Sequence, residues 1–129
     1  MRWEVFYYQT ERGDSPIEEF LNTLPRKARA KCLAYIDMLE EFGLSLPRAF
    51  IAKIREELWE LRPEWAGTEY RFLYCMQAGR KVIIVHALTK KAQKLKTGDI
   101  ELALARAAEV KRRLTREGAS PIRQRTDQA

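Results

Sequence analysis

The chain has 129 residues, of which 46% are hydrophobic and 10% aromatic, with 24 Lys and Arg against 18 Asp and Glu. This is the composition of one ordinary globular domain, and the length excludes two domains of typical size. The sequence contains no apolar run of the roughly 18 residues that a membrane span needs, and its first residues lack the apolar segment of a signal peptide, so we expect a cytoplasmic protein without membrane contacts.

The first part of the chain predicts one strand and two helices. Residues 3–10 are rich in aromatic and β-branched side chains, which favour a strand. Ser15, Pro16 and Glu18 form the start signal of a helix, with Ser15 as the cap and Glu18 completing a capping box. A second helix is predicted over residues 25–42 from apolar residues at three- and four-residue spacing, and Gly43 is placed to end it in a left-handed conformation.

The period then changes to two, which predicts strands at residues 58–62, 68–77 and 81–88. In the second of these, Tyr70, Phe72 and Tyr74 alternate with Arg71 and Leu73, so the aromatic side chains share one face. The third is apolar on both faces and is expected to be central. The short turns between these strands favour an antiparallel meander.

A last helix is predicted from Thr97 to Leu114, and residues 115–129 have few apolar side chains and no period. We therefore expect a single domain over residues 1–114 and a mobile polar tail over 115–129. The order β-α-α-β-β-β-α predicts an α+β fold, with helices packed on one face of the sheet and the other face open.

The net charge of +6 favours a nucleic-acid partner or an acidic protein partner. Alternation places Glu60, Arg62 and Arg71 on the open face of the sheet, and a run of lysines follows at its rim. The rim lysines are Lys90, Lys91, Lys94 and Lys96. Such a surface suits RNA cleavage, in which cations stabilise the phosphorane and a proton donor serves the departing 5′-oxygen.

Each of these features also has a purely structural interpretation. Arg71 fits a solvated residue on an exposed sheet face, Glu60 and Arg62 fit a surface ion pair, and the lysines fit a solvated loop. His86 lies in an apolar strand and fits a core or edge residue better than a catalyst. With one histidine and two separated cysteines, Cys32 and Cys75, we expect buried thiols and neither a metal site nor a cofactor.

The segment from Leu58 to Arg106 resembles the RelE/HigB superfamily of type II toxins, in its phage-derived HigB-like branch. The matching motifs are "LWELR" at residues 58–62, "YR" at 70–71, "VIIVHAL" at 82–88 and "TKKAQKLKTGDIELALAR" at 89–106. The chain departs from that branch in having "AQKLKTG" in place of "TQKTP" and "HAL" in place of "HGF". Residues 107–129 also lack the His or Tyr that some of these toxins use there.

The resemblance implies a RelE-like fold and a metal-independent mRNA interferase that cuts messages on the translating ribosome. It further implies a helix-turn-helix antitoxin of the HigA type as partner. By position, Arg62 and Arg71 would clamp the phosphate and Lys91 would act in proton transfer or charge stabilisation. Lys90, Lys94, Lys96 and Glu60 would line the RNA-binding surface.

Two other functions fit the same sequence. A ParE-like toxin would share the fold and act on DNA gyrase, although such proteins lack this cluster of cations. A non-catalytic RNA-binding or regulatory domain would use the basic face for salt-dependent binding without cleavage. Neither alternative is excluded by the residue pattern.

Overall fold

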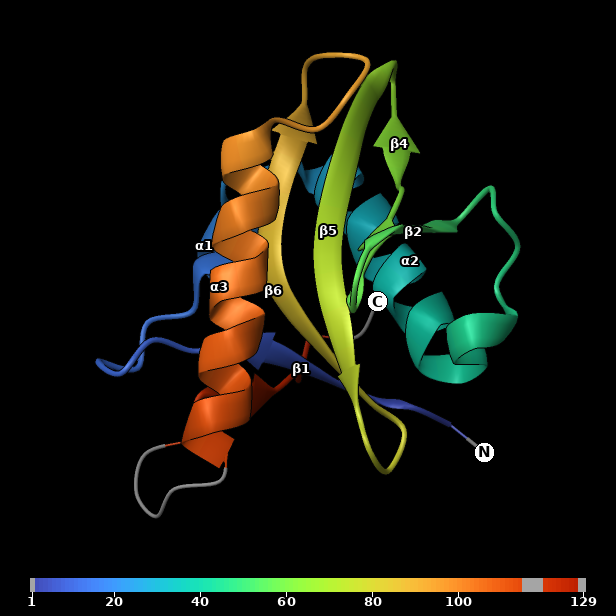
Figure 1. Cartoon of the computed structure of the whole chain (residues 1–129). Coiled ribbons are helices and arrows are strands. Elements are labelled where there is room, and N and C mark those ends of the chain that lie inside the picture. Colours follow the sequence, from blue (N-terminus) through green and yellow to red (C-terminus); the bar gives the residue numbers. More distant parts are fainter. Residues whose placement is uncertain (1, 115–119, 128–129) are drawn as a thin grey trace.

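The computed structural model describes residues 2–114 and 120–127, which form an α+β fold with a mixed sheet between two helical layers (Figure 1). The elements in chain order are β1 (Glu4–Tyr8), α1 (Pro16–Asn22), α2 (Arg26–Phe42), the short 3-10 helix η1 (Gly43–Ser45), β2 (Ile51–Arg55), β3 (Leu58–Leu61), β4 (Glu64–Trp65), β5 (Thr68–Gln77), β6 (Lys81–Lys90), α3 (Thr97–Leu114) and β7 (Ile122–Gln124). Among the described helices, none combines the length and the apolar character needed to cross a membrane.

The sheet has the strand order β2-β3-β5-β6-β1-β7, and β4 pairs with β5 beside this path. β1 and β6 run parallel, and the other pairs are antiparallel. The predicted antiparallel character and the central place of residues 81–88 are therefore confirmed. β5 and β6 form the longest pair, and their ends position the residues discussed below.

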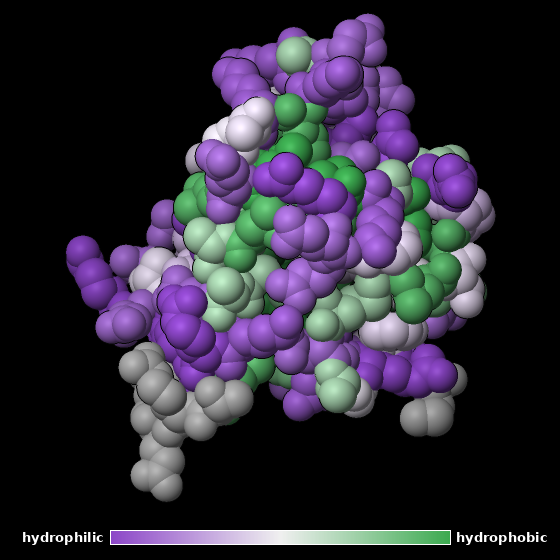
Figure 2. Space-filling view, viewed as in Figure 1, coloured by the Kyte–Doolittle hydropathy of each residue, from purple (hydrophilic) through white to green (hydrophobic). Residues whose placement is uncertain are grey.

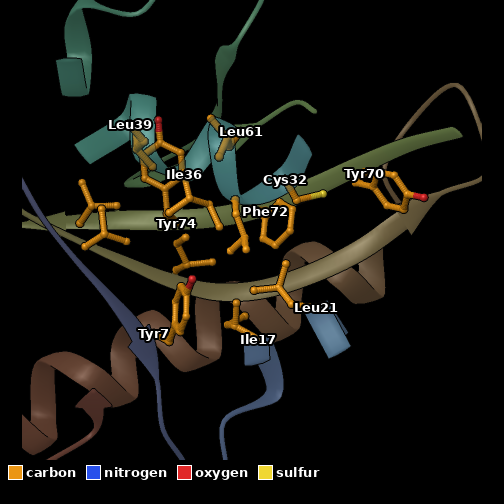
Figure 3. Close-up of a cluster of buried hydrophobic side chains, with 14 of the residues drawn as sticks. Tyr7, Ile17, Leu21, Cys32, Ile36, Leu39, Leu61, Tyr70, Phe72 and Tyr74 are labelled. Atoms are coloured by element: carbon orange, nitrogen blue, oxygen red, sulfur yellow. The ribbon is translucent and has the colours of Figure 1, made fainter. Parts of the chain in front are cut away.

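The helices α1 and α2 cover the face of the sheet that carries the aromatic residues of β5 (Figure 3). Tyr70, Phe72 and Tyr74 are buried there, as their alternation predicted. Phe20 of α1 contacts Phe72 edge to face, with 5.8 Å between the ring centroids. Burial of each such aromatic side chain contributes roughly 2 to 3 kcal/mol.

The starts and ends of these helices follow from local chemistry. Ser15 Oγ accepts a hydrogen bond from the Glu18 backbone N–H at 3.4 Å, which confirms Ser15 as the cap of α1. Gly43 ends α2, as predicted, with a φ of +53° and a ψ of −124°, so its φ is positive but its backbone lies outside the left-handed helical conformation. A Cβ on Gly43 would lie 2.0 Å from Nε1 of the Trp3 indole, so any larger residue here requires Trp3 to move.

The last helix corrects the expectation that all helices share one face and leave the other open. α3 packs on the face opposite α1 and α2, where it forms a second core with β5 and β6 (Figure 1). Ala103 and Ala107 of α3 are buried against this face, and their small side chains let the helix approach the sheet closely. Cys32 and Cys75 lie in the two different cores, and burial raises the pKa of each thiol to about 12, so both are buried thiols as predicted.

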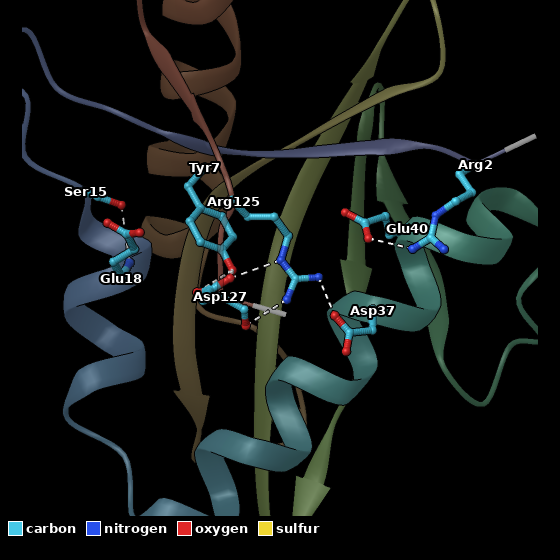
Figure 4. Close-up of polar contacts among 8 residues, drawn as sticks. All are labelled: Arg2, Tyr7, Ser15, Glu18, Asp37, Glu40, Arg125 and Asp127. Carbon is cyan, nitrogen blue, oxygen red and sulfur yellow. Dashed lines mark hydrogen bonds and ion pairs between the residues drawn. The ribbon is translucent and has the colours of Figure 1, made fainter. Parts of the chain in front are cut away.

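The end of the chain corrects the expectation of a mobile tail for residues 120–127. β7 pairs antiparallel with β1 and so extends the sheet. The buried Arg125 side chain pairs with Asp37 at 2.7 Å and with Asp127 at 3.1 Å, and the Tyr7 hydroxyl donates to Asp127 (Figure 4). The segment is held by contacts that are remote in sequence, which its polar composition does not reveal. Residues 115–119 and 128–129 of the expected tail lie outside the described residues.

Candidate functional site

The strands β3, β5 and β6 bring charged side chains together on the α3 face, at the end of the sheet near Thr68 and Lys90. The register pairs Glu69 with Lys90 and Arg71 with Leu88, so these side chains share a face. Glu60 lies opposite Leu73 on the adjacent strand β3 and points to the same side. The alternation in the sequence therefore predicted correctly that Glu60 and Arg71 share a face.

The surroundings of Arg71 differ from the open surface that the sequence predicted. Only 2% of Arg71 is exposed. Its Nη1 donates to the Tyr70 carbonyl at 2.8 Å, its Nη2 donates to Glu69, and its Nε lies 3.4 Å from Oε1 of Glu60 as an ion pair. We call Glu60, Glu69 and the Tyr70 carbonyl the arginine cage, because together they occupy the guanidinium.

Glu60 is buried as well, and it lies between two guanidinium groups. Arg62 approaches its Oε2 at 3.8 Å while Arg71 approaches its Oε1. Two cations beside one buried carboxylate compensate for part of the cost of removing that carboxylate from water. The prediction that Glu60 and Arg71 face solvent is wrong, because β3, β5 and the charged partners enclose them. Arg62, at the end of β3, keeps 37% of its side chain exposed.

Glu69 is the exposed member of the cage, with 48% of its side chain accessible. The hydrogen bond from Arg71 and the charge of its guanidinium lower the pKa of the Glu69 carboxyl, so the pair stays charged at neutral pH. Glu69 was not predicted from the sequence. The sequence nevertheless contained the pattern that indicates it, since a carboxylate two residues before Arg71 in a strand lies on the same face of the sheet as Arg71.

The lysines extend from this cluster along the connection between β6 and α3. Lys90 ends β6 with its Nζ 4.0 Å from Glu69, and residues 91–96 lead to α3. Lys91, Lys94 and Lys96 are exposed, and among residues 2–114 and 120–127 no carboxylate forms an ion pair with them. We call residues 90–96 the lysine segment.

Two adjoining hollows connect the lysine segment to the cage. One of about 260 Å³ is lined by the lysine segment together with Leu88 and Asp99, and the other contains Glu69, Lys90 and Lys91. Lys90 and Lys91 therefore lie between the cage and the remaining lysines. The arrangement offers the unpaired ammonium groups of Lys91, Lys94 and Lys96 to an anionic ligand, with the buried contact between Arg71 and Glu60 behind them.

His86 joins the sheet to the last helix. Its Nε2 lies 2.8 Å from Oδ1 of Asp99, in the first turn of α3, and the imidazole is mostly buried. The interpretation of His86 as a structural residue in the strand is consistent with this contact. Asp99, expected to favour the helix start, also anchors α3 beside the lysine segment.

A family model described as "Phage derived protein Gp49-like (DUF891)" matches residues 19–108. The match covers well over half of the 129 residues and includes the arginine cage, Arg62 and the lysine segment. No curated protein sequence matches the chain. The protein therefore belongs to the Gp49-like family of phage-derived proteins, a toxin-type family related to RelE and HigB.

Proposed function

We propose that the protein is the toxin of a type II toxin–antitoxin module and acts as a metal-independent endoribonuclease on messenger RNA. The observation that carries this proposal is the presence of accessible cations on both sides of the cage, with Arg62 beside Glu60 and the lysine segment beside Glu69. Membership of a toxin-type family supports the same conclusion. The enzyme acts in the cytoplasm on messages at the ribosome, and a helix-turn-helix antitoxin of the HigA type neutralises it.

In this proposal the lysine segment holds the RNA backbone. Lys90, Lys94 and Lys96 neutralise phosphates, which gives binding that weakens as salt rises. Glu60, which the sequence placed on the RNA surface, takes another role because it is buried. It fixes the directions of Arg62 and Arg71 by its two ion pairs.

The chemical step needs charge stabilisation and a proton donor. The ribose 2′-hydroxyl gives its proton to a base and attacks the phosphorus, the bond from phosphorus to the 5′-oxygen breaks, and that oxygen takes up a proton, which leaves a 2′,3′-cyclic phosphate. Arg62 is exposed and able to bind a phosphate oxygen directly. Lys91, surrounded by other cations, is our candidate for supplying the proton or stabilising the charge.

Arg71 requires a rearrangement before it contacts a phosphate. Its guanidinium is occupied by Glu60 and Glu69, and Glu69 is the one with solvent access. In this proposal the scissile phosphate displaces Glu69 from Arg71, so that one anion replaces another. The buried ion pair with Glu60 stays in place and keeps the guanidinium oriented.

The burial of Arg71 also favours a second candidate function. If the cage does not open, the same cations bind RNA without cutting it, as a non-catalytic RNA-binding domain does. The two functions differ in whether new RNA ends appear. The experiment must therefore detect new RNA ends.

The test is to induce the full chain alone in a bacterium, follow growth and map new 5′ ends in total mRNA. Lys91→Ala and Arg62→Ala alter exposed cations of the site, whereas Lys27→Ala removes an exposed cation from α2 on the opposite face. We expect growth arrest with cuts in translated messages, reduced by the first two variants and unchanged by the third. Arrest without cuts would redirect the proposal to a gyrase-type target, and RNA binding without cuts would leave the non-catalytic domain.

A further inference from the structure

A groove of about 570 Å³ runs along the edge of the sheet at β2, away from the lysine segment. We call it the edge groove. It is lined by Leu44, Leu46, Arg48, Ile51, Ala52, Lys53, Trp59 and Arg62. Its residues come from the connection after α2, from β2 and from β3, so the fold assembles it from three consecutive parts of the chain.

The floor of the edge groove is apolar. Leu46 and Ile51 are buried in it and Trp59 is half-buried. Leu44 is 50% exposed, and the neighbouring Phe42 at the end of α2 is 47% exposed. Figure 2 shows hydrophobic residues gathered on the side of the molecule where α2 ends, bordered by hydrophilic ones. Exposed apolar side chains that cluster in this way mark an interaction site.

The rim of the edge groove is positively charged. Arg48, Lys53 and Arg62 line it, and no carboxylate belongs to the lining. Within the described part of the chain, no ion pair engages Arg48 or Lys53. The complementary ligand is therefore amphipathic and acidic.

The backbone at the groove adds a third feature. Among the described strands, β2 pairs with β3 alone and forms one edge of the sheet. The Ile51 N–H donates to the Pro47 carbonyl at 3.3 Å, and the remaining outer N–H and C=O groups of β2 are a template for a further strand. A polypeptide satisfies these groups in a regular ladder, whereas RNA does not.

We propose that the edge groove binds an extended, acidic, amphipathic segment of a partner protein, which adds as a strand beside β2. Alternate apolar side chains of the segment contact Leu44, Leu46 and Trp59, and its carboxylates pair with Arg48, Lys53 and Arg62. Arg62 belongs both to this groove and to the candidate site, so the bound segment removes one cation from the site. Identification of the partner as the antitoxin rests on the proposed function, whereas the docking site does not.

The test measures binding of a labelled synthetic peptide in which Leu and Glu alternate, by fluorescence anisotropy at physiological ionic strength with the full chain. Lys53→Glu reverses a rim charge and Leu44→Ser removes an exposed part of the floor. Lys27→Glu reverses an exposed charge on α2, outside the groove, and is the matched control. We expect each of the first two variants to weaken binding roughly tenfold and the control to leave it unchanged.

Hydrogen exchange of the β2 amides locates the peptide, because strand addition slows exchange in residues 51–55. An equal loss with Lys27→Glu, or no slowing in β2, overturns the proposal. Tighter binding of a Leu/Lys peptide or of oligouridylate to the same groove, or self-association through it, also overturns it. Peptide binding is read without any RNA cleavage, so its result and the result of the mRNA mapping are independent.

Discussion

At the scale of single residues, the most informative feature is a buried arginine with two carboxylate partners. Arg71 and Glu60 are both enclosed, and they form an ion pair in the interior. Removal of one partner from such a pair leaves an uncompensated buried charge, which costs more than the pair contributes. Arg71 therefore stabilises the fold whatever its part in catalysis.

This dependence predicts the effect of Arg71→Met, which keeps most of the volume and removes the charge. We expect the free energy of unfolding to fall by about 3–5 kcal/mol, because Glu60 loses its buried partner. Urea unfolding followed by circular dichroism measures the change. Arg62→Met is the control, since Arg62 is 37% exposed and 3.8 Å from Glu60, and it should cost about 1 kcal/mol or less.

The double variant Arg71→Met with Glu60→Gln separates the charge from the packing. The loss of stability should be smaller than in Arg71→Met alone, since the orphaned carboxylate is gone. An equal or larger loss in the double variant would refute the buried-pair explanation.

At the scale of elements, the residues that begin and end helices were predicted correctly from the sequence, whereas the short strands were not recognised. The cap at Ser15 and the stop at Gly43 follow from the preferences of individual residues. β2, β4 and β7 were missed, because β4 and β7 have only two and three residues and because apolar and polar side chains do not alternate throughout the sequence IAKIR of β2. Their existence depends on partners far along the chain, as in the pairing of β7 with β1.

At the end of α2, Gly43 allows a prediction that is tested by comparison with Gly79. Gly43→Ala and Gly79→Ala both place a side chain at positive φ, but only at Gly43 does the new Cβ meet another group, the Trp3 indole. We expect Gly79→Ala to cost about 1–2 kcal/mol from backbone strain. Gly43→Ala should cost clearly more in the same thermal and urea unfolding experiments, and equal costs would show that Trp3 moves aside freely.

The attachment of β7 gives a second prediction at this scale. Arg125→Met removes a buried guanidinium that pairs with Asp37 and Asp127, so stability should fall by about 3 kcal/mol. Hydrogen exchange of β1 amides that face β7 should accelerate. Arg123→Met, two residues earlier in β7, removes an exposed pair with Glu18 and should change stability by about 1 kcal/mol or less. Similar effects of the two changes would contradict the anchoring role of Arg125.

At the scale of the whole molecule, charge and layering together decide which surface meets a polyanion. The net charge of +6 favours such a partner in general. α3 covers much of the second face, which leaves the lysine segment and Arg62 as the accessible cations around the cage. The RNA-binding surface that we propose is therefore a rim beside α3, smaller than the open face expected from the sequence.

Salt dependence tests this surface. For single-stranded RNA, each phosphate contact contributes about 0.7 to the slope of log affinity against log salt. Lys94→Ala should reduce the slope for oligouridylate by about that amount and weaken binding for all sequences alike. Lys27→Ala on α2 should leave the slope unchanged, and an equal change in both variants would indicate diffuse attraction without a defined site.

The sequence by itself determined the α+β class, the three helices, the central strands and the residues that share a face, because these depend on local propensity and on periods of 3.6 and 2. It also determined that Glu60 and Arg71 share a face of the sheet. Tertiary structure alone decided that α3 covers the second face, that β7 completes the sheet and that Arg71 is enclosed by Glu60 and Glu69. Alternation along a strand determines the direction of a side chain, but burial depends on what another part of the chain places above it.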